Sequence, residues 1–240
     1  MKRLFIFLTA TWLMAGAAFA QEDLLRGRSD RLMIDFFTDI WSNAPENMDM
    51  NTINRGINIT MMQDFPLGNS PISFATGLGI ASHNLYSDHF FDYAPMFWSS
   101  TFPQPGTYDF TPIGDTYGEV KKNKLNLNYL NLPLELRYRN NSLPHTFRIT
   151  AGVRAGYLVN AHTKTHIKND NGGVGISTQE ERKYKEHKLG NLEKFQFGLS
   201  GRIGYGRINL NAYLPLTKIF KDNSVTDMKP FSLGLTFIVY

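Results

Sequence analysis

The sequence predicts an all-β fold: an eight-stranded antiparallel up-and-down transmembrane β-barrel formed by residues 21–240. Three observations support this prediction. Apolar and polar residues alternate along eight segments, which is the two-residue period of a strand. Short and long connections alternate between these segments, as in outer-membrane barrels. No stretch after residue 20 has the ~18 consecutive apolar residues of a spanning helix, so entry into a membrane would require strands.

Residues 1–20 have the features of an export signal. Residues 1–3 (Met-Lys-Arg) are positively charged, and residues 4–15 form an uncharged, mostly apolar run. Residues 18–20 (Ala-Phe-Ala) match the small-x-small pattern that signal peptidase cleaves. The run is too short for a membrane anchor. We therefore expect a signal peptide over residues 1–20 and an exported chain that starts at Gln21.

The composition of residues 21–240 excludes several kinds of function. This part of the chain holds 23 basic and 21 acidic residues, a net charge near +2, so a nucleic-acid partner is not expected. The chain has no cysteine, which excludes a disulfide framework, a thiolate zinc site and a thiol nucleophile. We expect no cofactor.

Eight strands are predicted, and most reach the ~9–11 residues that a tilted strand needs to cross a bilayer. The first three strands have Trp41, Phe65 and Tyr86 near one end, as the interfacial aromatic girdles of such barrels require. The predicted ranges are 31–41, 53–65, 71–86, 123–139, 146–160, 194–206, 207–217 and 230–240.

The fourth strand, 123–139, changes its apolar parity, because Leu125 and Leu127 are odd-numbered and Leu130 is even-numbered. One extra residue near Asn128-Tyr129, a β-bulge, would restore a single outward apolar face. Pro133 removes a ladder donor from this strand.

The later strands alternate more regularly. Over 146–160 the odd positions are apolar and the even ones are mostly small or polar, with Leu158 as the exception. Over 194–206, Phe195, Phe197 and Leu199 share one face. The strand 207–217 contains Pro215, and the strand 230–240 ends on an aromatic residue, as is typical of outer-membrane barrels.

The connections predict the orientation of the barrel. Short, turn-like links occupy 66–70, 140–145 and 206–207, and long links occupy 42–52, 87–122, 161–193 and 218–229. Short turns are periplasmic in outer-membrane barrels and long loops are external, so both termini are expected in the periplasm.

A soluble barrel would show the same period with its faces reversed. The small polar residues of the polar faces and the aromatic residues near strand ends favour the membrane barrel, with outer-membrane lipid against its apolar side.

Residues 128–138, Asn-Tyr-Leu-Asn-Leu-Pro-Leu-Glu-Leu-Arg-Tyr, resemble a strand of the PorT-like outer-membrane β-barrel family, and the resemblance continues at 151–158, 197–205 and the last strand. It implies an eight-stranded barrel in the outer membrane of a Gram-negative cell. Because the sequence has no Gly-x-Ser-x-Gly elbow or other nucleophile signature, we expect no enzymatic activity. The member that names the family is an accessory of type IX protein secretion, so the resemblance implies a role in secretion or envelope assembly and a protein partner from that machinery. A small-solute or lipid-binding barrel and a surface hydrolase are the alternatives.

The polar faces collect charged residues that we expect inside the barrel. Eight strands enclose a space just wide enough for side chains, so opposite charges there would pair. An ion-pair plug that fixes the strand register, or a gated solute or proton path, are the two interpretations. The predicted lumen charge network consists of Asp35, Asp39, Glu135, Arg137, Arg148, Arg154 and Arg202.

The link 87–122 is rich in aromatic residues and proline, which predicts either a lid over the barrel mouth or a surface for a partner or lipid. Its candidate contact residues are Phe90, Phe91, Tyr93, Phe97, Trp98, Phe102, Tyr108 and Phe110.

Two other clusters carry candidate chemistry. His162 and His166 have i,i+4 spacing, but Lys164 lies between them, so a solvated histidine pair is expected and no metal site. A hydrolase would use Ser82, His83, Asp88, His89 and Asp92 at the external end of the third strand. Ser82 and His83 are sequence neighbours that would point to opposite faces of a strand.

Overall fold

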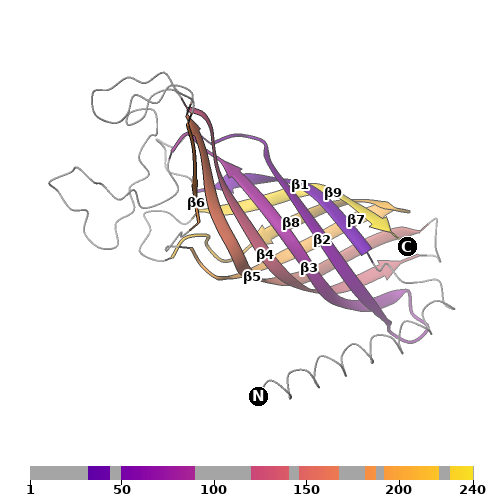
Figure 1. Cartoon of the computed structure of the whole chain (residues 1–240). Coiled ribbons are helices and arrows are strands. Elements are labelled where there is room, and N and C mark those ends of the chain that lie inside the picture. Colours follow the sequence, from indigo (N-terminus) through magenta and orange to yellow (C-terminus); the bar gives the residue numbers. More distant parts are fainter. Residues whose placement is uncertain are drawn as a thin grey trace, which may run out of the picture.

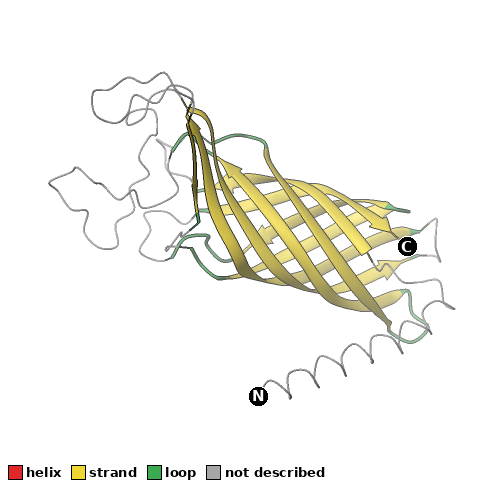
Figure 2. Cartoon of the chain, in the orientation of Figure 1, coloured by secondary structure: helices red, strands yellow, loops and turns green. Residues whose placement is uncertain are grey.

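The computed structural model describes residues 32–43, 50–89, 120–140, 146–167, 182–187, 192–221 and 228–239. This part of the chain forms strands and connecting segments without a helix (Figure 2). The strands are β1 (Leu32–Ser42), β2 (Asn54–Pro66), β3 (Ile72–Tyr86), β4 (Val120–Arg139), β5 (Phe147–Ile167), β6 (Arg182–Glu186), β7 (Phe195–Tyr205), β8 (Ile208–Pro215) and β9 (Lys229–Val239). In the described residues, no helix is long and apolar enough to cross a membrane.

The strands form one closed antiparallel barrel (Figure 1). The order around the sheet is β4-β3-β2-β1-β9-β8-β7-β5, and the additional pairing of β4 with β5 closes it. Eight strands make the barrel, and the short β6 pairs with β5 outside the ring of eight. The predicted fold class is confirmed.

Large apolar side chains cover the outside of the barrel. Phe36, Met61 and Leu210 are 52%, 68% and 59% exposed, and their neighbours in sequence are buried. The same alternation runs along every barrel strand, as it does on Ile80, Leu132, Leu136, Val153, Phe197, Ile203 and Leu235. A soluble barrel would have these faces reversed, so the observed polarity is that of a barrel surrounded by lipid.

The two ends of the barrel differ (Figure 1). The links between β2 and β3, β4 and β5, and β7 and β8 are short, and we name the end where they lie the turn end. At the opposite end, the loop end, the tips of β4, β5 and β6 stand beyond the rest of the barrel. Gly206, at φ 60°, takes the left-handed conformation required by the tight turn between β7 and β8.

The strand β5 continues seven residues past the predicted end at Asn160 and pairs with β6 through residues 163–167. The prediction that 161–193 is wholly a connecting link is therefore wrong. In the added part, the outward residues are His162, Lys164 and His166, so the apolar alternation that identifies a membrane strand is absent.

The irregularity predicted near Asn128-Tyr129 is present, but the extra residue belongs to β5. Asn128 pairs with Asn160 and Tyr129 pairs with Leu158, which leaves Val159 as the unpaired bulge residue. The parity of β4 does not change, so the expectation of a single outward apolar face is wrong. Two leucines of this strand, Leu125 and Leu127, point inward and are buried, because the loop-end part of the interior is apolar.

Pro133 lies within β4 opposite Arg154 of β5. On the other side, the pairing of β4 with β3 is interrupted between Thr76 and Gly79, next to Pro133, which has no N–H to donate. The Thr76 hydroxyl donates to the Pro133 carbonyl at 3.0 Å. Pro215 is the last residue of β8, where it interrupts less of the ladder. Tyr240 lies outside the described residues, as do residues 1–31.

Candidate functional site

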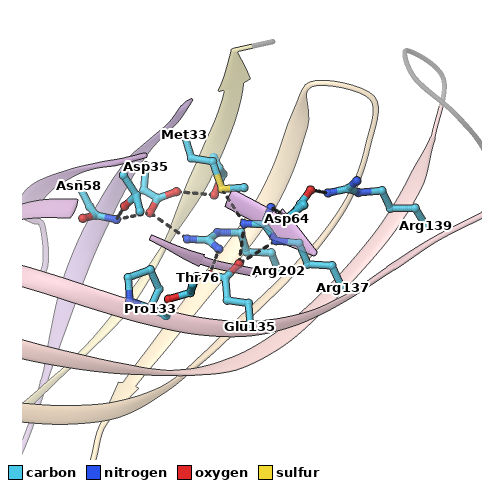
Figure 3. A network of polar contacts seen from close by, with 12 residues as sticks. Met33, Asp35, Asn58, Asp64, Thr76, Pro133, Glu135, Arg137, Arg139 and Arg202 are labelled. Carbon is cyan, nitrogen blue, oxygen red and sulfur yellow. Dashed lines mark hydrogen bonds and ion pairs between the residues drawn. The ribbon is translucent and has the colours of Figure 1, made fainter. Parts of the chain in front are cut away.

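The inward faces of the barrel strands form a buried charged network in the half near the turn end (Figure 3). Each member occupies an inward position because its strand alternates and its neighbours are the apolar residues of the lipid-facing surface. The seven predicted lumen residues are all buried, with exposures of 2% for Asp35, 0% for Asp39, 1% for Glu135, 2% for Arg137, 4% for Arg148, 8% for Arg154 and 7% for Arg202.

Arg137 lies between two carboxylates. Its Nη2 donates to Glu135 Oε2 at 2.8 Å, and its Nη1 donates to Asp64 Oδ1 at 2.7 Å. Asp64 also accepts a hydrogen bond from Arg139 at the end of β4. Asp64 was not among the predicted lumen residues, although it lies on the inward parity of β2 and is 5% exposed.

Arg202 of β7 crosses the interior to the carboxylates of two other strands. Its guanidinium pairs with Glu135 of β4 and, at 3.3 Å, with Asp35 of β1. Asp35 also accepts hydrogen bonds from Thr236 Oγ1 at 2.6 Å and from Asn58 Nδ2 at 2.7 Å. The bonds of Arg202 connect strands that do not pair with each other in the barrel, so they fix the relative positions of residues far apart in sequence.

The two remaining arginines complete the polar interior. The Arg154 guanidinium lies 4.6 Å from the centroid of the Tyr213 ring, a cation–π arrangement. Arg148 Nη1 donates to the Gly206 carbonyl at 2.5 Å and so holds the turn between β7 and β8.

A second buried group joins Asp39, His83 and Ser232. Asp39 Oδ2 lies 2.8 Å from His83 Nδ1, and the Ser232 hydroxyl donates to Asp39 Oδ1 at 2.5 Å. The His83 ring packs against Phe37 at 4.9 Å and against the edge of Tyr129 at 5.8 Å, measured between ring centroids. His83 is therefore an interior residue beside the charged network and not a residue of the barrel rim.

Of the residues proposed for hydrolysis, the four that the structure describes do not assemble into a nucleophile and its base. Ser82 lies on the face opposite to His83, where its hydroxyl accepts a hydrogen bond from Asn126 Nδ2 at 3.0 Å. His89 Nδ1 contacts the neighbouring carboxylate of Asp88 at 2.5 Å. Asp92, the fifth candidate, lies outside the described residues.

An apolar cluster fills the interior between the charged network and the loop end. Its buried members come from β3, β4 and the segments beside β7 and β9: Leu85, Leu125, Leu127, Tyr129, Leu192, Ile219, Phe220 and Met228. Trp41, Met50, Leu158 and Ala161 pack against it. The two main layers of the described interior are thus one of ion pairs and one of apolar side chains, and a smaller apolar cluster of Met33, Met62, Ala75 and Ile238 lies near the turn end.

The loop end has a polar pocket of about 420 Å³. Arg55, Tyr86, Asp88 and Lys122 are among the residues that line it. Lys122 Nζ lies 5.0 Å from the centroid of the Tyr86 ring. The predicted aromatic contact residues of the link 87–122, from Phe90 to Phe110, lie outside the described residues.

His162 and His166 lie on the same face of β5, four strand residues and therefore roughly 13 Å apart along the strand, too far to share a metal. His162 instead lies 5.5 Å from His187, measured between ring centroids. Burial lowers the pKa of His162, and the nearby Lys185, Lys164, His187 and Lys124 lower it further. Among the residues that the structure describes, no three His, Asp or Glu side chains gather in a metal-binding arrangement.

A closed antiparallel barrel with an apolar exterior and a polar, side-chain-filled interior defines an integral outer-membrane β-barrel protein. The sequence profile of the outer membrane protein beta-barrel domain family matches residues 33–221, so the chain belongs to this family and is located in the outer membrane.

Solved structures give weaker similarities. Ail, the attachment invasion locus protein of Yersinia pestis, has 9% sequence identity and a TM-score of 0.33, covering 86% of this chain and 95% of Ail. Two mutants of the Rh. blastica porin have 6% and 8% identity and TM-scores of 0.20, covering 87% of this chain and 100% of the porin. The comparison with curated proteins finds no match.

Proposed function

We propose that this outer-membrane barrel is not an enzyme and acts through protein contacts at its loop end. The observation that carries the proposal is the filled interior. The Glu135–Arg202 network and the apolar cluster around Leu127 occupy the space that a solute path would need. Eight strands leave room for side chains and not for a wide aqueous channel. We therefore place the protein contacts on the surfaces at the loop end and not in the barrel interior.

The strand extension at the loop end is a candidate contact surface. Within the described residues, β6 pairs with β5 on one side, and its other edge has no strand partner. Such an edge presents backbone N–H and C=O groups to which an extended segment of another protein can pair. The link 87–122, with its aromatic residues, remains a second candidate surface from the sequence.

The proposed biological role is an accessory function in protein secretion, of the type IX kind, or in envelope assembly. It rests on the PorT-like resemblance of residues 128–138 and of the later strands. In the proposed orientation the loop end is external and the turn end faces the periplasm, as in other outer-membrane barrels. Residues 1–20 act as a cleaved signal in this proposal.

The test is crosslinking in intact cells, followed by purification in mild detergent and mass spectrometry. A Lys185→Pro variant removes a pairing donor from β6, and Lys185→Gln is the matched control that leaves the backbone intact. We expect a protein partner with the wild type and with Lys185→Gln, and much less of it with Lys185→Pro. Equal recovery with both variants would show that β6 is not the contact. Absence of any partner, together with a channel current in planar bilayers, would overturn the proposal.

A small-solute or lipid-binding barrel is the second candidate, because the loop-end pocket of about 420 Å³ is in the size range of ligand sites. Equilibrium binding with the Arg55→Gln and Tyr86→Ala variants, which alter its lining, tests this candidate. For the hydrolase alternative, His83→Ala and His89→Ala are the diagnostic substitutions; loss of a measured hydrolytic activity in either would support an enzyme.

A further inference from the structure

The outward face of the extension formed by β4, β5 and β6 carries a block of cationic side chains. We name this block the lysine face; it consists of Lys122, Lys124, Lys164, Lys183 and Lys185 together with His162, His166 and His187. The register aligns these residues in rows across the three strands. Lys124 pairs with Lys164, which pairs with Lys185, and Lys122 pairs with His166, which pairs with Lys183.

The row of Lys124, Lys164 and Lys185 places like charges directly opposite one another, an arrangement that destabilises a sheet, and in the other row two lysines flank His166. The alternating residues between them, including Asn123, Thr163 and Thr165, point inward and are buried. On these strand segments the outward positions hold no acidic residue, and no described residue forms an ion pair with any of the five lysines. The neighbours present are polar or aromatic: Lys124 Nζ donates to Asn84 Oδ1 at 2.6 Å, and Lys122 lies over the Tyr86 ring.

The electrostatics reflect this crowding of charge. Burial lowers the pKa of Lys124, and the neighbouring Lys122 and Lys164 lower it further. None of the five lysines has an ion-pair partner among the described residues, and an anion with several charges would relieve the repulsion among the lysines of both rows at once.

The position of the lysine face relative to the apolar exterior identifies the source of the anion. On β5 the last exposed apolar residue is Val159, and Asn160 and His162 follow it. With a rise of ~3.3 Å per residue and a tilt of ~40°, His162 stands about 8 Å above Val159 and Lys164 about 13 Å above it. The headgroup layer of each leaflet is roughly 5–8 Å thick. The face thus begins at headgroup level and extends above it.

We propose that the lysine face binds the phosphate groups of a phosphorylated glycolipid in the outer leaflet. Lysine ammonium groups bind phosphate as compact point charges, and a sugar headgroup is tall enough to present anions to the upper rows. The inference rests on the external orientation of the loop end given under the proposed function. The lysine face would bind this lipid through its side chains, whereas the proposed protein contact uses the backbone groups at the free edge of β6.

The test measures lipid binding to the full-length protein in maltoside detergent by native mass spectrometry. The probes are diphosphorylated lipid A, the same glycolipid without its phosphates, and phosphatidylcholine. The test variant, named the central-row variant, carries Lys124→Gln, Lys164→Gln and Lys185→Gln, which removes the row made of lysines alone. The matched control carries Arg207→Gln, Lys221→Gln and Lys229→Gln, which removes the same charge elsewhere.

At a factor of about five per lysine, the central-row variant is expected to bind diphosphorylated lipid A on the order of 100-fold more weakly than the wild type. The control is expected to stay within about twofold, and the phosphate-free glycolipid and phosphatidylcholine are expected to bind the wild type weakly. The heat-dependent gel shift of each variant reports whether its barrel is intact, and exposed lysine substitutions should leave it unchanged.

Equal losses in the two triple variants, or tight binding of the phosphate-free glycolipid, would overturn the inference. So would inorganic polyphosphate that binds as tightly as the lipid, since the site would then be one for soluble polyanions. The orientation is tested separately, because the chain has no native cysteine. Lys183→Cys should react with an impermeant maleimide in intact cells; no reaction would refute the orientation while leaving the measured lipid affinity as it stands.

Discussion

Glu135→Gln is the substitution that best tests the charged network. Glu135 is 1% exposed and accepts hydrogen bonds from Arg137 and from Arg202. The substitution keeps the shape of the side chain and removes its charge, so two buried guanidinium groups each lose one of their carboxylate partners. Breaking a buried ion pair from one side costs about 3–5 kcal/mol, and we expect a loss of this size in the free energy of unfolding.

The assay is reversible urea unfolding of the barrel in lipid vesicles, followed by tryptophan fluorescence and by the heat-dependent gel shift. Lys221→Gln, which removes an exposed charge, is the control and should change the free energy of unfolding by less than ~0.5 kcal/mol. Arg202→Met and the double variant complete a mutant cycle. Since Glu135 and Arg202 are in contact, we expect a coupling energy of roughly 2 kcal/mol.

Two results would refute this reasoning. A loss below about 1 kcal/mol for Glu135→Gln would mean that water reaches the network and screens it. A coupling energy near zero would mean that the two side chains do not interact in the folded barrel, whatever the separate losses.

Three further predictions concern other parts of the barrel. Leu127→Ala, in the buried apolar cluster, should lower the free energy of unfolding by about 2–5 kcal/mol, and the lipid-facing Leu130→Ala should lower it less; equal losses would contradict the two-layer interior. Leu134→Arg, on the lipid-facing side of β4, should cost about 2–4 kcal/mol in vesicles, and a neutral effect would contradict burial of this face in lipid. His162 has a lowered pKa in the folded protein, so the unfolded state binds more protons and pairing of β5 with β6 should weaken as the pH falls below about 6.5. Amide hydrogen exchange at residues 163–167 should show this weakening and His162→Gln should abolish it; exchange that His162→Gln leaves equally pH-dependent would contradict the assignment.

The sequence predicts the barrel strands well because lipid imposes one rule on all of them. Where the outward residues face the hydrocarbon of the membrane, as along 195–205, the sequence shows the two-residue period. There the predicted strand limits agree with the observed ones within a few residues. Beyond the hydrocarbon, outward residues need not be apolar, and the two-residue period is lost. The residues of β5 after Asn160 and all of β6 therefore lack the signal, although they pair as regular strands.

The interior is harder to predict for a different reason. Inward positions are expected to be polar, and in the half of the barrel that contains Glu135 and Arg202 most of them are, although Met33, Met62, Ala75 and Ile238 form a small buried apolar cluster there. In the other half an apolar cluster fills much of the interior, so the inward Leu125 and Leu127 look like lipid-facing residues in the sequence but have the opposite parity. The buried positions of His83 and Asp64 were predictable from the sequence, because both are ionisable residues on the inward parity of their strands.

The bonds made by Arg202 also constrain how the barrel can assemble. Its partner Asp35 lies 167 positions earlier in the chain, on the strand that pairs with the last one to complete the ring. Until that final seam forms, Arg202 and Asp35 would be held apart in hydrocarbon, at a cost of several kcal/mol for a charge left without its partner. Partly inserted barrels are therefore higher in free energy, and the buried charges favour the closed barrel, in which β1 pairs with β9.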